Sequence, residues 1–138
     1  MKTLSLFVGV FSLLVAIAIA GPIITVAEGQ LEGHSVVHNG RSANHFIGVP
    51  YATPPVDSLR WEAPLPAKKW SGIRQATAFG PECIQSVNAM ETTVSEDCLY
   101  LNIFAPGDNT TKTYPVMIYF FGGSWEWGGT SLPLYDGD

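Results

Sequence analysis

Residues 116–121 form a continuous apolar run of strand length, rich in β-branched and aromatic side chains. Pro115 precedes this run and Gly122 ends it. An apolar run without polar alternation is typical of a strand buried on both faces, as in the parallel sheet of an α/β protein. The run leads into Gly122, Gly123 and Ser124, where glycine allows backbone amides to approach a ligand closely. Open α/β folds bind ligands at such junctions, although a tight turn without chemistry is the alternative for two glycines alone.

The chain before residue 50 has shorter apolar stretches that alternate with turn signals. Asn39-Gly40 is a strong hairpin signal, because both residues tolerate the positive φ angles of a two-residue turn. Glu28-Gly29 marks a second turn. We therefore expect an antiparallel meander and no helix bundle, with strands at residues 23–27, 30–33, 35–38 and 45–49.

Residues 50–66 contain five prolines, a density that excludes a helix interior or a central strand. A disordered linker is the alternative, but Tyr51, Leu59 and Trp61 are too apolar for one. The stretch predicts an ordered loop that wraps the domain surface.

A further strand is expected at residues 99–105, after a loop or short helix at residues 84–95. The polar residues 106–113 connect this strand to the apolar run at 116–121. Because the connection is short, we expect these two strands to form an antiparallel pair.

Residues 1–20 have the features of a signal peptide. Lys2 supplies the positive charge, residues 4–19 are apolar, and Ala18-Ile19-Ala20 forms a small-x-small cleavage site before Gly21. A retained membrane anchor is the alternative, since the uncharged run is just long enough to span a bilayer. We expect cleavage, a secreted domain at residues 21–138, and no integral membrane segment after cleavage.

The charge distribution bears on possible partners. Seven basic and twelve acidic side chains give a formal net charge of −5, and no basic stripe or cluster interrupts the dispersed acids. This argues against nucleic acid or an anionic membrane surface as a partner.

The chain has two cysteines, Cys83 and Cys98. Export to an oxidising compartment predicts a disulfide between them, worth roughly 3 kcal/mol on the chain-entropy model; two buried thiols are the alternative. Neither cysteine has a CxxC partner, and His34 and His38 lie in a strand pattern, so no metal site is predicted. Asn109-Thr110-Thr111 is a glycosylation sequon, and Asn109 is its acceptor.

Three stretches, in this order, resemble the type-B carboxylesterase/lipase family, the cholinesterase-like α/β-hydrolases. They are residues 46–61 with Pro64 and Trp70, Ser-Glu-Asp-Cys-Leu-Tyr-Leu-Asn-Ile at 95–103, and Pro-Val-Met-Ile-Tyr-Phe-Phe-Gly-Gly-Ser at 115–124 with Gly128. The resemblance covers nearly all of residues 23–138. It implies an α/β class, as the incomplete N-terminal portion of an α/β-hydrolase fold, and a carboxylic ester hydrolase without a cofactor.

The resemblance also implies a role for Gly122, Gly123 and Ser124 as the oxyanion-hole loop. Backbone N–H groups of Gly123 and Ser124 would donate to the tetrahedral oxyanion, each worth roughly 2.7–4 kcal/mol in the transition state. Phe121 replaces the family's commonest histidine, and Ser124 replaces a third glycine. Residues 125–131 look closest to secreted fungal lipases, which implies a small-molecule ester or lipid substrate with a hydrophobic acyl or alcohol group.

The nucleophile of this family lies in a Gly-x-Ser-x-Gly elbow. No serine of residues 1–138 fits, since the nearest match fails at Glu126. We expect the N-terminal part of an esterase, with the oxyanion loop but without the serine, acid and histidine triad, and inactive by itself. The alternatives are a non-catalytic binding or adhesion module of the same fold, and a truncated, inactive product.

Arg60 and Glu96 resemble the family's structural ion pair, which ties the proline-rich loop to the signature segment. We expect a partly buried pair near the disulfide, and breaking a buried pair costs about 3–5 kcal/mol. Nothing in the sequence makes the neighbouring Asp97 a catalytic acid.

Overall fold

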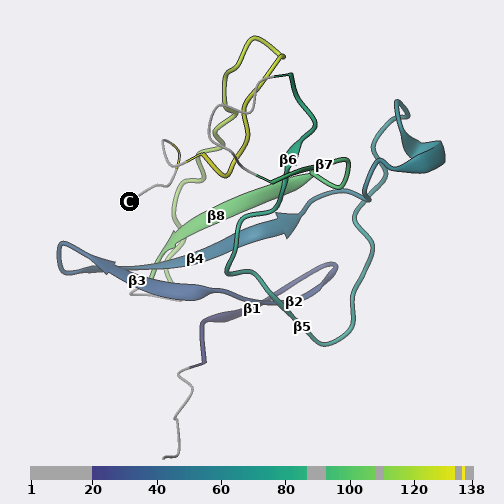
Figure 1. The fold of residues 1–138 in the computed structure, drawn as a ribbon. Helices are drawn as coiled ribbons and strands as arrows, with labels where there is room; N and C mark the ends of the chain where they lie inside the picture. Colours follow the sequence, from purple (N-terminus) through teal and green to yellow (C-terminus); the bar gives the residue numbers. More distant parts are fainter. Residues whose placement is uncertain (1–19, 87–92, 108–110, 133–134, 136–138) are drawn as a thin grey trace, which may run out of the picture.

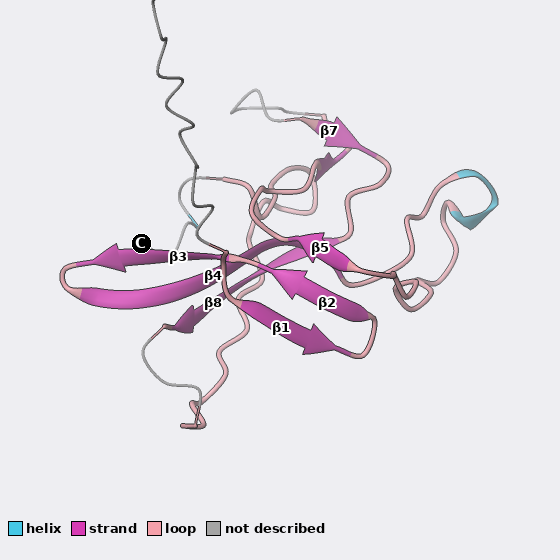
Figure 2. Cartoon of the chain, turned by 90° about the horizontal axis from the view of Figure 1, so that it is seen from below, coloured by secondary structure: helices cyan, strands magenta, loops and turns pink. Residues whose placement is uncertain are grey.

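The computed structural model describes residues 20–86, 93–107, 111–132 and 135. Within these residues the chain is built from strands, loops and one short 3-10 helix, with no α-helix (Figures 1 and 2). No helix in the described ranges is long and apolar enough to cross a membrane. Residues 1–19 of the predicted signal peptide and the sequon asparagine, Asn109, lie outside the described residues.

The first sheet has the order β1-β2-β5. Strand β1 (Ile23–Val26) pairs with β2 (Gly29–Glu32) as an antiparallel hairpin, as the apolar pattern predicts. Strand β5 (Ile73–Gln75) adds in parallel to β2 and was not predicted, because its three residues are mostly polar.

The second sheet has the order β3-β4-β8 and is antiparallel throughout. Its strands are β3 (His34–His38), β4 (Arg41–Pro50) and β8 (Tyr100–Pro106). The β3–β4 hairpin turns at Asn39 and Gly40, whose φ angles of 49° and 76° are both left-handed. This is the geometry of a type I′ turn, so the predicted hairpin is confirmed.

The meander expected from residues 23–49 is wrong in one respect, because its two hairpins belong to different sheets. The chain passes between the sheets at Gly33, where a Cβ atom would lie 2.2 Å from the carbonyl oxygen of His45. Ile47 in β4 then binds the segment after β5, through its N–H and the carbonyl of Ala76 at 2.8 Å. This bond links the two sheets.

The core lies where the two sheets meet. Its buried residues come from β2, β4 and the segment after β5, and they are Leu31, Phe46, Val49 and Ala76. Side chains at the margin pack against this cluster: Ile24, Val26, Trp70 and Leu101. Trp70 is fixed by its indole N–H, which donates to the carbonyl of Gln30 at 2.8 Å. The proline-rich loop thus returns to the first sheet through an aromatic anchor.

The proline-rich loop is ordered, as predicted, and contains the 3-10 helix η1 (Asp57–Leu59). Its two ends meet at a bridge between Ala52 and Pro66, and the Thr53 hydroxyl donates to the Pro66 carbonyl at 2.7 Å. The loop does not wrap the surface as expected. Figures 1 and 2 show η1 projecting away from both sheets, because the loop closes on itself.

A two-stranded parallel pair, β6 (Glu82–Cys83) and β7 (Val94–Ser95), precedes β8. Cys83 in β6 forms a disulfide with Cys98, so this prediction from the sequence is confirmed. The bond closes a loop of which residues 87–92 are outside the description.

The strand predicted at residues 116–121 is wrong. These residues form no strand, and Val116, Met117 and Phe120 are 88%, 92% and 85% exposed. The expected pair with β8 does not form either, since β8 bonds only to β4 among the described residues. A strand needs a neighbour for its amides, and a doubly apolar strand needs cover on both faces. The described residues provide neither for this run.

Candidate functional site

The glycine-rich loop after the apolar run is a tight turn at residues 122–128. The carbonyl of Gly123 accepts two backbone hydrogen bonds, from the N–H groups of Glu126 at 2.9 Å and Trp127 at 3.2 Å. Gly123 has a φ of 143°, and a Cβ atom there would lie 1.8 Å from the carbonyl oxygen of Trp127. Only glycine fits this position.

Ser124 and Trp125 are both left-handed, with φ angles of 57° and 60°. Each costs roughly 1–2 kcal/mol for a residue with a Cβ atom. Ser124, which stands where the family commonly has a third glycine, therefore adopts a strained φ, and the backbone still makes the turn. Such strain persists only when surrounding contacts hold the loop.

The N–H groups of this turn fall into two sets. Those of Glu126 and Trp127 are bonded within the loop, and that of Gly128 is bonded to a side chain. By contrast, within the described ranges no acceptor binds the N–H groups of the first half of the turn, which are those of Gly122, Gly123, Ser124 and Trp125. Gly122 itself is exposed, and a Cβ atom there would meet nothing within 4 Å.

The end of the loop is held by the second sheet. Asn102 in β8 donates from Nδ2 to the Thr130 carbonyl at 3.0 Å, while its Oδ1 accepts the N–H of Gly48 at 3.0 Å. Gly48 lies at the bulge where the β4–β8 register shifts. The sequence does not predict this role of Asn102, because its two partners are backbone groups 54 and 28 residues away.

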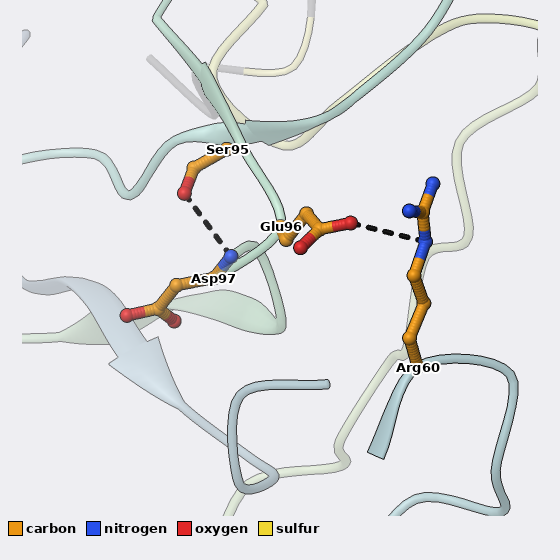
Figure 3. Close-up of polar contacts among 4 residues, drawn as sticks. All are labelled: Arg60, Ser95, Glu96 and Asp97. Carbon is orange, nitrogen blue, oxygen red and sulfur yellow. Dashed lines mark hydrogen bonds and ion pairs between the residues drawn. The ribbon is translucent and has the colours of Figure 1, made fainter. Parts of the chain in front are cut away.

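The signature segment at residues 95–98 makes a compact set of polar contacts (Figure 3). The Ser95 hydroxyl accepts the N–H of Asp97 at 3.1 Å, and Glu96 Oε1 lies 3.0 Å from Arg60 Nε. The Arg60 and Glu96 side chains are 57% and 35% exposed, so the pair is less buried than expected. Arg60 belongs to the projecting proline-rich loop, and its guanidinium lies over the ring of Trp61, 5.4 Å from the ring centroid.

Asp97 makes a structural hydrogen bond with Tyr100. Its Oδ1 accepts the Tyr100 hydroxyl at 2.9 Å. Burial raises the pKa of Tyr100, and the bond to Asp97 and the negative charge of its carboxylate raise it further. Arg74 opposes this shift. The carboxylate thus holds a neutral phenol at the start of β8.

No group of three or more His, Cys, Asp or Glu residues that could hold a metal ion occurs in the described part of the chain. His34 contacts His45 edge to face, with ring centroids 5.3 Å apart, and His45 contacts Phe104 in the same way at 4.7 Å. These histidines pack on the second sheet.

A shallow hollow of about 240 Å³ lies in the proline-rich loop, away from the glycine-rich turn in sequence. Its lining is mostly apolar and comprises Thr53, Pro55, Leu59, Glu62, Ala63, Pro64, Leu65 and Leu99. It has no residue of the candidate oxyanion loop, so we do not assign it to the substrate.

The sequence of this chain matches a protein-family model. The model is described as "Carboxylesterase family", and the match covers residues 20–138. The chain belongs to the carboxylesterase family. The resemblance read from its three motifs is therefore confirmed.

Characterised relatives agree with this membership. Mouse cholinesterase is 38% identical over 127 residues, which cover 83% of this chain and 21% of that protein. Para-nitrobenzyl esterase of Bacillus subtilis (strain 168) is 40% identical over 121 residues, covering 83% and 24% respectively. Fumonisin B1 esterase of Sphingopyxis macrogoltabida is 43% identical over 96 residues, covering 67% and 18%. The aligned region spans about a fifth of the length of these relatives.

Proposed function

We propose that this carboxylesterase-family chain supplies the oxyanion loop of a secreted carboxylic ester hydrolase with an α/β-hydrolase fold. The observation that carries the proposal is the division of amides in the glycine-rich turn. Glu126, Trp127 and Gly128 have bonded N–H groups, while those of Gly122 to Trp125, which include the proposed donors Gly123 and Ser124, have no acceptor among the described residues. Unpaired donors on a rigid turn are suited to a transient anion.

Ester hydrolysis develops negative charge on the carbonyl oxygen when a nucleophile attacks. Donors already aimed at that oxygen stabilise the transition state without reorganising. In this proposal Gly123 and Ser124 bind the oxygen, and the exposed Gly122 begins the loop. Residues 1–138 contain no Gly-x-Ser-x-Gly elbow, so hydrolysis in this proposal needs a nucleophile, acid and histidine that these residues do not supply.

The surroundings of the turn favour a hydrophobic ester. Trp125, which directly follows the proposed donor Ser124, is fully exposed, and Trp127, two residues further on, is 43% exposed. Exposed indoles beside a reaction centre would contact an apolar acyl or alcohol group. A small-molecule ester or lipid is therefore the proposed substrate class.

Export is part of the same proposal. The disulfide between Cys83 and Cys98 supports an oxidising compartment, and the signal peptide and the glycan at Asn109 remain predictions. N-terminal sequencing of the secreted product tests cleavage before Gly21, and a start at Met1 would contradict it.

The function is tested with the complete gene product and a series of p-nitrophenyl esters of increasing acyl length. We expect turnover that a serine-directed phosphonate abolishes with one covalent label. A folded, secreted product without turnover on any chain length would reject hydrolysis and favour the non-catalytic binding module.

A further inference from the structure

The buried end of the glycine-rich loop is held by one side-chain amide from another part of the chain. The N–H of Gly128 donates to Gln85 Oε1 at 2.7 Å, and Gln85 Nε2 lies 3.2 Å from the Gly128 carbonyl oxygen. These residues are 43 positions apart in sequence. Buried peptide groups need partners, and Gln85 accepts the Gly128 N–H while its Nε2, which has two hydrogens, is shared between the Gly128 carbonyl and two nearer acceptors.

Gln85 is itself held in a fixed orientation. Its Nε2 also lies 2.9 Å from Glu82 Oε2 and 3.1 Å from the Cys83 carbonyl, so its Oε1 faces Gly128. Glu82 is only 5% exposed, and its other oxygen accepts the Ser131 hydroxyl at 2.6 Å. The amide is thus anchored beside the disulfide cysteine, on a segment that does not belong to the loop.

The contact at Gly128 reaches the proposed donors through the backbone. Gly128 has a φ of 119°, and a Cβ atom there would lie 2.8 Å from the carbonyl oxygen of Gly122. The preceding residue, Trp127, donates its N–H to the Gly123 carbonyl. The end of the loop therefore lies against its beginning, and a shift of Gly128 would move Gly122 and Gly123.

We propose that Gln85 is a positioning residue that fixes the amides of Gly123 and Ser124 by holding Gly128. The inference rests on the proposed function for its effect on catalysis, but the positioning itself is independent of it. Gln85 touches no substrate in this proposal. It stabilises the strained turn that Ser124 and Trp125 require.

The test uses the complete gene product with Gln85→Met, which keeps the side-chain length and removes the amide. Gln30→Met is the matched control, because Gln30 is an exposed residue of β2. In the Gln85 variant we expect faster hydrogen exchange in peptides covering residues 122–129. On a p-nitrophenyl ester we expect kcat to fall about 10- to 100-fold, as for a displaced catalytic group, with KM changed less than about twofold. The control should match the parent in both measurements.

A double variant that exchanges the amide of Gln85 and the carboxylate of Glu82 tests whether the lost activity can be restored. Gln85→Glu alone keeps an acceptor for the Gly128 N–H but places two carboxylates side by side. Adding Glu82→Gln restores a donor between them, so the double variant should recover part of the lost kcat and of the exchange protection. It also carries the test if Gln85→Met does not fold.

Unchanged exchange at residues 122–129 in Gln85→Met would overturn the positioning role. Faster exchange with an unchanged kcat would overturn its link to the oxyanion. If the parent protein hydrolyses no ester, the proposed function fails, and hydrogen exchange still decides whether Gln85 fixes the loop.

Discussion

Two apolar runs of this chain, one in β4 and the other at residues 116–121, differ sharply in burial. In β4, Phe46, Ile47 and Val49 are 3%, 6% and 7% exposed. In residues 116–120, every side chain is at least 66% exposed. Strand β4 has β3 on one side and β8 on the other, whereas the second run has no strand beside it in the part of the chain that the structure describes. Apolar pattern indicates the environment a segment requires, and a hydrogen-bonded neighbour decides whether it becomes a strand.

The largest expected difference between the two runs is in side-chain truncation. Phe46→Ala removes a core side chain and should lower the free energy of unfolding of the chain by about 3–5 kcal/mol. Phe120→Ala, the matched change in the exposed run, should alter it by less than about 0.5 kcal/mol. Urea unfolding followed by tryptophan fluorescence measures both. Equal losses would show that residues 116–121 are packed in solution.

A second expected effect concerns Gly48, which lies at the bulge of β4 and is bound by Asn102. Gly48 has a φ of 72°, and a Cβ atom there would lie 2.3 Å from the Ala78 carbonyl oxygen. Gly40 has a similar φ of 76° but nothing within 4 Å. Gly40→Ala should cost about 1–2 kcal/mol for backbone strain. Gly48→Ala should cost about 1–3 kcal/mol more through overpacking, and equal thermal shifts would contradict this.

The ion pair of the projecting loop should matter less than a buried pair. At the observed exposure, Arg60→Met should lower the free energy of unfolding by less than about 1 kcal/mol, and salt should reduce the difference. Lys68→Met is the control at another exposed basic residue. A loss near the 3–5 kcal/mol expected for a buried pair would mean that the loop is covered in solution.

The smallest effect is at the first sheet and depends on pH. The Gln75 side-chain amide, and to a smaller extent the Gly21 N–H, donate hydrogen bonds to the Glu32 carboxylate and lower its pKa from its ordinary value. Because the folded-state pKa is lowered, the stability from these bonds is present above the unfolded pKa. It is lost as pH falls through the folded pKa. Melting temperatures between about pH 5 and pH 2 should fall more for the parent than for Glu32→Gln. Parallel profiles would reject the contribution.

The sequence predicts the fold best where local chemistry decides. Asn39-Gly40 specifies a two-residue turn, and the strands on either side follow at the expected places. Strand β5 could not be found, because Ile73, Arg74 and Gln75 carry no strand pattern and pair with β2 through tertiary contact alone. The separation of the two hairpins is set by the packing of Gly33 against His45, which no local pattern encodes.

The same limit applies to the candidate site. The glycine-rich turn is recognisable because Gly122 and Gly123 follow an apolar run. Gln85 is not recognisable, because its partner lies 43 residues away and is a backbone group of any residue type. The exposure of Arg60 also could not be inferred, since it depends on how far the proline-rich loop projects from the sheets.

The contacts of Asn102 make the end of the glycine-rich loop depend on the second sheet. Its oxygen binds Gly48, 54 residues earlier, and its nitrogen binds Thr130, 28 residues later. Its place between them requires the pairing of β8 with β4, since the bulge sets the position of Gly48. Asn102 therefore reaches Gly48 and Thr130 together only when β8 is paired with β4. The end of the glycine-rich loop depends on the assembled second sheet for its position.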